Sequence, residues 1–159
     1  MKIFSGEEAR KAFEYLEHAA IAAQNSCCLR SRCGSVLVKD DKIIGKGYNA
    51  PPLDVKLEYC LKDSLPFNFK SDKTCCVHAE QRAIMGALRH YPGLIAGSRL
   101  YFIRLDEQGN KKESGDPYCT ICSKFSLDAG VSEFVLWRKE GICVYGTVEY
   151  NDLSFKFKG

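Results

Sequence analysis

Residues 34–48 carry the sequence GSVLVKDDKIIGKGY, in which two short runs rich in β-branched residues lie on either side of a short charged segment. β-Branched side chains favour extended strands, and Lys39-Asp40-Asp41 suits a tight turn. The stretch therefore predicts a β-hairpin formed by residues 34–38 and 42–48. Prolines and charges follow it, so residues 50–74 are expected to form a long loop of a kind that is often functional.

A helix is predicted upstream of the hairpin. Ser5 and Glu8 form a Ser-x-x-Glu capping box, which places the start of this helix at Ser5. The helix is expected to continue to about residue 24, because apolar residues recur at helical spacing. Its buried stripe is expected to consist of Phe13, Leu16, Ala20 and Ala23.

Two further helices are predicted downstream. One begins at His78 and ends before Pro92, and the other runs from about Cys119 to Ala129. Gly130 favours the end of the latter helix, because glycine is common at the C′ position. The buried side of the first is expected to contain Ala79, Ala83, Ala87 and Leu88.

The remaining periodic segments are β-rich. Strands are predicted at residues 99–105 and 131–137, and residues 141–148 are expected to pair with 153–157 around the turn Tyr150-Asn151-Asp152. This order predicts an α/β fold with one mixed central sheet of about five strands and helices on its faces. No repeat or linker divides the chain, so residues 1–159 are expected to form a single domain.

Composition and charge limit the kinds of function that the chain is expected to have. The chain has 159 residues and a formal net charge of +3, which is weaker than a dedicated nucleic-acid-binding domain usually carries. No leader and no apolar stretch of about 18 residues is recognised, so membrane insertion is not expected. We therefore expect a cytoplasmic protein whose nine cysteines stay reduced and serve metal binding, catalysis or burial.

Two segments combine metal-ligating and acid–base side chains: His78-Ala79-Glu80 and Cys119-Thr120-Ile121-Cys122. Thiols three residues apart at a helix start lie on one side of the first turn, and the helix dipole lowers their pKa. Zinc accepts sulfur and nitrogen ligands in tetrahedral geometry, so two thiolates and one imidazole leave a position for water. Glu80 beside such a metal is placed to shuttle protons, a pattern that resembles the zinc nucleobase deaminases.

The resemblance to the cytidine and deoxycytidylate deaminase superfamily extends over roughly residues 10–137 and is closest to the deoxycytidylate deaminases. Residues 26–38, SCCLRSRCGSVLV, are similar to a Ser-Thr-Cys-x-Arg stretch that leads into a Val-Gly-Ala-Val strand. Residues 47–52, GYNAPP, are similar to a Gly-Tyr-Asn-Gly-x-Pro segment. The resemblance implies a three-layer α-β-α fold of the cytidine deaminase type. It also implies a zinc-dependent enzyme that hydrolyses a cytosine nucleoside or nucleotide to its uracil form and ammonia.

The resemblance also implies roles for individual residues. Glu80 becomes the catalytic acid and base, Asn49 a contact to the substrate's sugar and Arg30 a contact to a phosphate. The alternative explanation of Asn49 is that it is simply a turn residue, and that of Arg30 is that it is a solvated arginine on a loop. Self-association into a homo-oligomer is a further implication of the resemblance. The implied zinc ligands are His78, Cys119 and Cys122. In some members a second, structural zinc is held by cysteines that align with Cys28, Cys60 and Cys76, which simple burial explains equally well.

Three departures from the family pattern concern the substrate. Tyr118 separates Pro117 from Cys119, where the family has proline directly before the cysteine. Arg82 takes the place of an asparagine in the second position after His-Ala-Glu, and residues 144–159 have a β-like rather than a helical pattern. The zinc chemistry does not depend on these positions, whereas the identity of the nucleotide does.

Other functions stay open on the sequence. The same chemistry can act on another nucleobase or on tRNA, although tRNA binding normally requires more cations than this chain concentrates. A non-catalytic, zinc-stabilised binding module would need a fourth protein ligand to close the metal. A thiol redox protein using Cys119 and Cys122 would keep its activity in the presence of a chelator.

Overall fold

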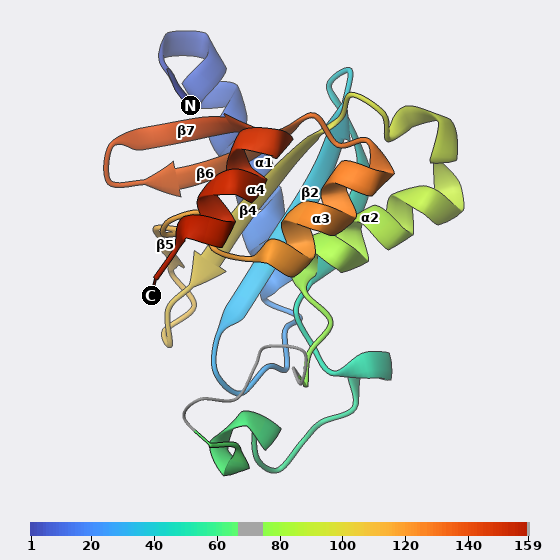
Figure 1. The fold of residues 1–159 in the computed structure, drawn as a ribbon, viewed down its shortest axis with the longest axis vertical. Coiled ribbons are helices and arrows are strands. Elements are labelled where there is room, and N and C mark those ends of the chain that lie inside the picture. The colour runs from blue at the N-terminus through green and yellow to red at the C-terminus, as the bar shows by residue number, and fades with distance from the viewer. Residues whose placement is uncertain (67–74, 159) are drawn as a thin grey trace.

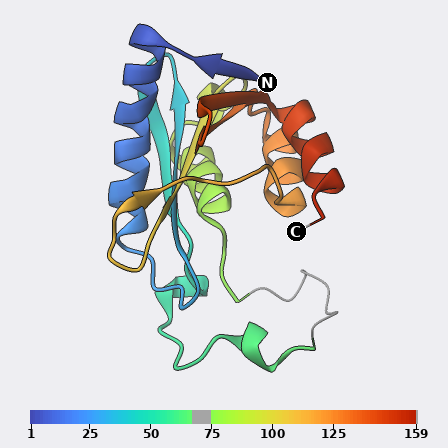
Figure 2. The ribbon, with the colours of Figure 1, turned by 90° about the vertical axis from the view of Figure 1, so that its left-hand side faces the viewer.

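The computed structural model describes residues 1–66 and 75–158, and their helices and strands form three layers (Figure 1). A mixed sheet occupies the middle layer. Helix α1 covers one face of it, and helices α2, α3 and α4 lie on the other face, as Figure 2 shows. The α/β class and the three-layer arrangement expected from the sequence are confirmed.

Four helices and seven strands are present in the described part of the chain. The helices are α1 (Gly6–Ala23), α2 (Ala79–His90), α3 (Thr120–Ala129) and α4 (Thr147–Lys156). The strands are β1 (Lys2–Phe4), β2 (Arg32–Lys39), β3 (Lys42–Tyr48), β4 (Arg99–Leu105), β5 (Lys111–Lys112), β6 (Glu133–Arg138) and β7 (Gly141–Gly146). Within residues 1–66 and 75–158, no helix combines the length and the apolar character that crossing a bilayer requires.

The strand order β1-β7-β6-β4-β2-β3, with β5 paired to β4, determines where the two central helices begin. Strand β2 is antiparallel to both β3 and β4, and β4 is parallel to β6, so β3, β4 and β6 point the same way. Helices α2 and α3 follow β3 and β4 in the chain. Their N-termini therefore lie beyond the carboxyl ends of these strands, where open α/β sheets commonly bind ligands.

The sheet has seven strands where the sequence predicts about five. The two shortest strands, β1 and β5, have three and two residues, too few to produce a recognisable alternation. The β2–β3 hairpin is confirmed. Its turn places Asp40 and Asp41 at φ values of 46° and 61°, which Asp tolerates and which match the twist of a two-residue hairpin loop.

Helices α1 and α2 approach the sheet closely at its glycines, where backbone and alanine make the contacts. A Cβ atom added to Gly34 would lie 1.9 Å from the carbonyl oxygen of Ala19, in α1. Larger side chains, Leu16 of α1 and Ile84 of α2, are fully buried beside these points. Phe13 and Leu88, which the periodicity places on buried faces, are 44% and 47% exposed. The predicted helix start is confirmed with Ser5 as N-cap, but its side chain makes no capping hydrogen bond.

The C-terminal segment is a helix, so the predicted pairing of residues 141–148 with 153–157 is wrong. Thr147, Tyr150 and Ser154 are buried, and their spacing of three and four residues marks one face of a helix. The Tyr150 ring stacks on that of Phe134 with centroids 3.9 Å apart. Asn151, interpreted from the sequence as a turn residue, accepts a hydrogen bond from the Ser123 hydroxyl of α3 at 2.8 Å. Tertiary packing thus outweighs the local turn signal.

Between β4 and α3 the chain makes a detour that contains β5. Ser114 fixes the return of this detour, because its backbone N–H donates to the Trp137 carbonyl at 2.8 Å and its hydroxyl donates to the Phe102 carbonyl at 2.9 Å. At the tip, the backbone N–H of Asn110 donates to the Asp106 carboxylate at 2.7 Å. Residues 106–116 therefore form an ordered excursion attached to the sheet at both ends.

The contact between β3 and α2 has little tolerance for added atoms. A Cβ on Gly47 would lie 2.1 Å from the Ala79 carbonyl oxygen and 2.5 Å from the Ala83 nitrogen. We expect Gly47→Ala to lower the free energy of unfolding by about 1–3 kcal/mol or more, because backbone cannot move aside as a side chain can. Denaturant unfolding followed by circular dichroism measures this change.

Gly86→Ala is the matched control in α2. A Cβ there meets nothing closer than the Lys46 carbonyl oxygen at 3.9 Å, and alanine stabilises a helix interior by about 1 kcal/mol relative to glycine. This variant is expected to be as stable as the parent or more so. Equal stability of Gly47→Ala and Gly86→Ala would contradict the close approach of α2 to β3.

Candidate metal centre and pocket

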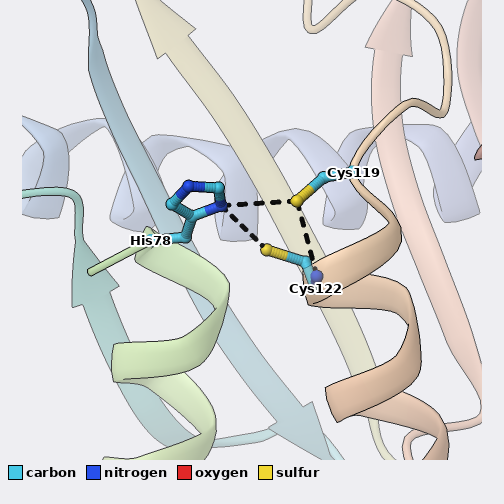
Figure 3. A group of neighbouring side chains, drawn as sticks. All are labelled: His78, Cys119 and Cys122. Carbon is cyan, nitrogen blue, oxygen red and sulfur yellow. Dashed lines mark hydrogen bonds between the residues drawn. The ribbon is translucent and has the colours of Figure 1, made fainter. Parts of the chain in front are cut away.

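The tips of α2 and α3 bring one imidazole and two thiols together, as Figure 3 shows. His78 is the N-cap of α2, Cys119 is the N-cap of α3, and Cys122 lies in the first turn of α3. The His78 Nδ1 atom is 3.2 Å from the Cys122 sulfur and 3.3 Å from the Cys119 sulfur. The sequence prediction that these three residues share one place in the fold agrees with this geometry.

Local hydrogen bonds hold the three side chains in position. The backbone N–H of Cys122 donates to the Cys119 sulfur at 3.4 Å, which orients the first thiol across the start of α3. The backbone N–H of His78 donates to the side-chain oxygen of Gln81 at 3.0 Å, which satisfies one exposed donor at the start of α2. Both helices thus begin at a residue that also presents a metal-binding atom.

The donor set fits Zn²⁺. One ring nitrogen and two sulfurs lie within 4.8 Å of one another, and this is the only such group of His, Cys, Asp or Glu among residues 1–66 and 75–158. Nitrogen and sulfur are the ligand types that zinc favours, and three protein ligands are typical of a zinc that keeps one position for water. The fourth corner is therefore available to a reactant.

The charges at the site favour a cation. Hydrogen bonding from Cys122 and from His78 outweighs burial and lowers the pKa of Cys119 to about 4. The same shared proton, together with burial, raises the pKa of Cys122 well above its usual value. Cys119 is therefore the more acidic thiol of the pair, and its hydrogen bond with His78 in turn raises the pKa of the imidazole.

Glu80 lies beside this group without belonging to it. Its side chain is on the first turn of α2 and the residue is only 5% exposed. Burial, with a smaller contribution from Cys119, raises the pKa of its carboxyl group. The Cys122 thiol hydrogen-bonds to this carboxyl group. A carboxyl group with a raised pKa next to a metal centre is suited to both accepting and donating a proton.

The site opens into a pocket of about 260 Å³. His78, Glu80 and Cys119 line it, and the two substrate contacts implied by the resemblance, Asn49 and Arg30, also line it. The volume is close to that expected of a small-ligand site. The structure thus gathers the candidate residues around one cavity, except Cys122, which does not line it but contacts His78, which does.

Asn49 has a structural role in addition to its place in the pocket. Its side-chain oxygen accepts hydrogen bonds from the Cys33 backbone N–H at 2.7 Å and from the Ser26 hydroxyl at 2.8 Å. Its side-chain nitrogen donates to the Ser31 carbonyl at 2.9 Å. These bonds connect the end of β3 to the α1–β2 loop, and one N–H of the amide remains for a ligand.

Arg30 lines the pocket and pairs with Asp63. Its side chain is 51% exposed, so the ion pair is in contact with solvent and can rearrange. Lys62 also lines the pocket. The pocket wall therefore carries cationic side chains as well as Cys119 and the buried carboxyl group of Glu80.

The cysteines considered for a second zinc do not form a second compact group in the described residues. The Cys60 sulfur lies 3.4 Å from that of Cys75, and Cys28 shares a hydrogen bond with Cys76. The sequence interpretation did not include Cys75. All four of these cysteines line the pocket.

Two wall residues, Cys33 and Phe102, were not anticipated. Their side chains reach the pocket from β2 and β4, because Ser35 of β2 pairs with Phe102 and the two strands run antiparallel. Only the register of this pairing, which the sequence does not show, identifies them. The inserted Tyr118 also lines the pocket, with its ring 5.2 Å from the Arg104 guanidinium carbon. Because Tyr118 precedes the N-cap, it leaves the Cys-x-x-Cys turn intact.

Comparison with known proteins gives a consistent result. The family model described as "Cytidine and deoxycytidylate deaminase zinc-binding region" matches residues 9–138. The deoxycytidylate deaminase of Mycobacterium phage D29 is 33% identical over 134 residues, which cover 79% of this chain and 92% of that protein. The deoxycytidylate deaminase of Saccharomyces cerevisiae is 29% identical over 126 residues, and the match spans only 35% of its length.

Solved structures share the fold. The dCMP deaminase of cyanophage S-TIM5 in complex with dCMP and dUMP has a TM-score of 0.56 and 24% identity, with 82% of each chain covered. A cytidine deaminase from Burkholderia pseudomallei has a TM-score of 0.55 and 18% identity, with 87% of this chain and 94% of that chain covered. With a family model that matches most of its length and the metal-binding atoms gathered at two helix tips, the chain belongs to the cytidine and deoxycytidylate deaminase zinc-binding family.

Proposed function

We propose that residues 1–159 form one zinc-dependent deaminase domain that converts a cytosine nucleotide, deoxycytidylate or a close analogue, to its uracil form with release of ammonia. The observation that carries this proposal is the buried carboxyl group of Glu80 beside three zinc-type donor atoms in one pocket. A metal site with three protein ligands supports a catalytic rather than a purely structural role.

Glu80 performs the proton transfers. It accepts a proton from the water that attacks C4 of the base and delivers it to the neighbouring ring nitrogen. A second proton, taken from the new C4 hydroxyl group, then goes to the amino group, which leaves as ammonia while the C4 carbonyl forms. Zinc held by His78, Cys119 and Cys122 would supply Lewis acidity that brings the pKa of a coordinated water to about 7.

The pocket wall supports a phosphorylated substrate. Arg30 and Lys62 both line the pocket and add positive charge to its wall. A guanidinium group can bind a phosphate through two parallel hydrogen bonds, and Arg30 would exchange Asp63 for that partner. Asn49 also lines the pocket, and the second N–H of its amide, which has no partner among the described residues, suits a contact to the sugar. The curated relatives' names and the dCMP in the cyanophage structure agree with this choice.

We further propose, from the family resemblance, that the protein self-associates and acts in the cytoplasm. Exposed apolar side chains on α2 and α4, among them Met85, Leu88 and Phe155, are compatible with contacts between copies. A reducing compartment would also keep the Cys119 thiolate available to zinc.

Replacement of the proposed proton shuttle tests the chemistry. We expect Glu80→Gln to keep its zinc and its fold but to lower kcat by about 10²–10⁴-fold, because the amide cannot exchange protons. Zinc content by atomic spectroscopy and ammonia release from dCMP are the two measurements. His78→Ala is the comparison variant and should lose zinc. Undiminished turnover by Glu80→Gln would reject this mechanism.

A substrate panel tests the phosphate contact. We expect Arg30→Gln to raise KM for dCMP about tenfold and to leave KM for deoxycytidine unchanged, since a charged hydrogen bond is worth about 1.5–3 kcal/mol. Arg10→Gln is the matched control, because Arg10 also forms an exposed ion pair, with Glu7, but lies on α1. Turnover of a cytidine-containing RNA oligomer in preference to every free nucleotide would favour the tRNA alternative.

A further inference from the structure

The segment from Asn49 to Asp54, here called the pocket loop, follows β3 and carries two residues of the pocket wall, Asn49 and Pro51. Its first half is tied to the start of α2 by backbone. Ala50 and Val77 exchange hydrogen bonds of 3.2 Å and 2.9 Å, directly before His78. The second half, Pro51–Asp54, has no such bridge to another described strand and is held in a different way.

Arg82 holds this second half. It lies on α2, two residues after Glu80, and its side chain is 19% exposed. One terminal nitrogen forms an ion pair with the Asp54 carboxylate at 2.9 Å. The other donates to the Pro51 carbonyl at 3.0 Å and approaches the Ala50 carbonyl at 3.4 Å. A single guanidinium group thus contacts three residues of the pocket loop.

Tyr48 completes the arrangement. Its ring lies under the Arg82 guanidinium, with 4.9 Å between the ring centroid and the guanidinium carbon. Its hydroxyl donates to the second oxygen of the Asp54 carboxylate at 2.8 Å. Asp54 is therefore fixed from two sides, and the planar guanidinium is fixed by stacking. A lysine at this position would have neither the several N–H donors in one plane that contact the loop nor a flat group to stack on the Tyr48 ring.

The backbone of the pocket loop needs this support. Leu53 and Asp54 have φ values of 59° and 57°, in the left-handed region that leucine in particular disfavours. The Leu53 side chain is 94% exposed, so its own packing does not compensate for this conformation. The contacts of the Asp54 carboxylate with Arg82 and Tyr48 add to the turn hydrogen bond from the Asp54 N–H to the Pro51 carbonyl and stabilise it.

Arg82 is also poorly explained by stability alone. Its Nε atom is buried and has no hydrogen-bond partner among the described residues, an arrangement that is unfavourable for folding. Both terminal nitrogens of Arg82, by contrast, contact the pocket loop.

We propose that Arg82 is a positioning residue that holds the pocket loop against α2 and thereby determines how tightly the pocket binds its substrate. The link to the active site is short, because the same helical turn carries Glu80 and the same loop carries Asn49 and Pro51. This inference rests on the proposed deaminase function for its kinetic consequence. Its structural part, the restraint of the loop, stands without it.

Steady-state kinetics with dCMP test the consequence. Arg82→Ala is expected to raise KM about tenfold with kcat within about twofold of the parent and with zinc content unchanged, because the metal ligands and Glu80 do not depend on the loop. Arg82→Lys should recover only part of the loss. Arg99→Ala is the matched control: Arg99 forms a half-buried pair with Glu133 at 2.5 Å on the far part of the sheet. It should be less stable than the parent, with KM unchanged.

Amide hydrogen exchange tests the restraint independently of activity. The Asp54 N–H donates to the Pro51 carbonyl at 3.0 Å, and its exchange is expected to accelerate at least tenfold in Arg82→Ala and in Asp54→Asn. Asp54→Asn also serves if Arg82→Ala does not fold. Unchanged exchange in these variants, or a KM that changes equally in Arg82→Ala and Arg99→Ala, overturns the inference. A parent protein that lacks deaminase activity while exchange still accelerates would refute the proposed function alone.

Discussion

The direct packing of α2 on the backbone of β3 is the constraint on which the site depends. Gly45 and Gly47 allow the carbonyl oxygens of Ala83 and Ala79 to approach within a distance that no side chain would permit. This contact sets the height and the rotation of α2 over the sheet. The first residue beyond it, His78, is then directed towards α3, and Glu80 is directed inwards. A helix held by larger side chains would stand farther away and would be free to slide.

The second consequence of this packing is electrostatic. The amino-terminal ends of α2 and α3 meet at the pocket, and both carry partial positive charge. They face the Cys119 thiolate and the Glu80 carboxyl group, of which the carboxyl group is almost fully buried. Helix dipoles favour the anionic sulfur, while burial resists ionisation of the carboxyl group. A bound dication adds to the first effect and makes the centre a place where negative charge can develop without bulk water.

Elements whose structure is decided locally were predictable from the sequence. The hairpin at residues 34–48, the helix that ends at Gly130 and the gathering of His78, Cys119 and Cys122 all follow from short-range patterns or from motifs. Features decided by tertiary contact were not. Tyr150 looked like part of a turn, but stacking on Phe134 places it in a helix, and Phe13 looked buried but is 44% exposed. Pocket-wall residues such as Phe102 depend on strand register, which one sequence does not reveal.

The detour through β5 lies directly before the cysteine turn in the chain but does not determine its geometry. Ser114 forms hydrogen bonds with the Phe102 and Trp137 carbonyls, which fixes the chain where it returns to the sheet. The position of Cys119 therefore does not depend on the residues at the tip of the excursion. Residues 107–110 lie at that tip, mostly exposed, and Arg32 of β2 joins the tip to the body by donating to the Asp106 and Glu107 carbonyls. The excursion is therefore the natural place at which length can change, or at which a fluorophore or an affinity tag can be attached, while the geometry of the cysteine turn is preserved.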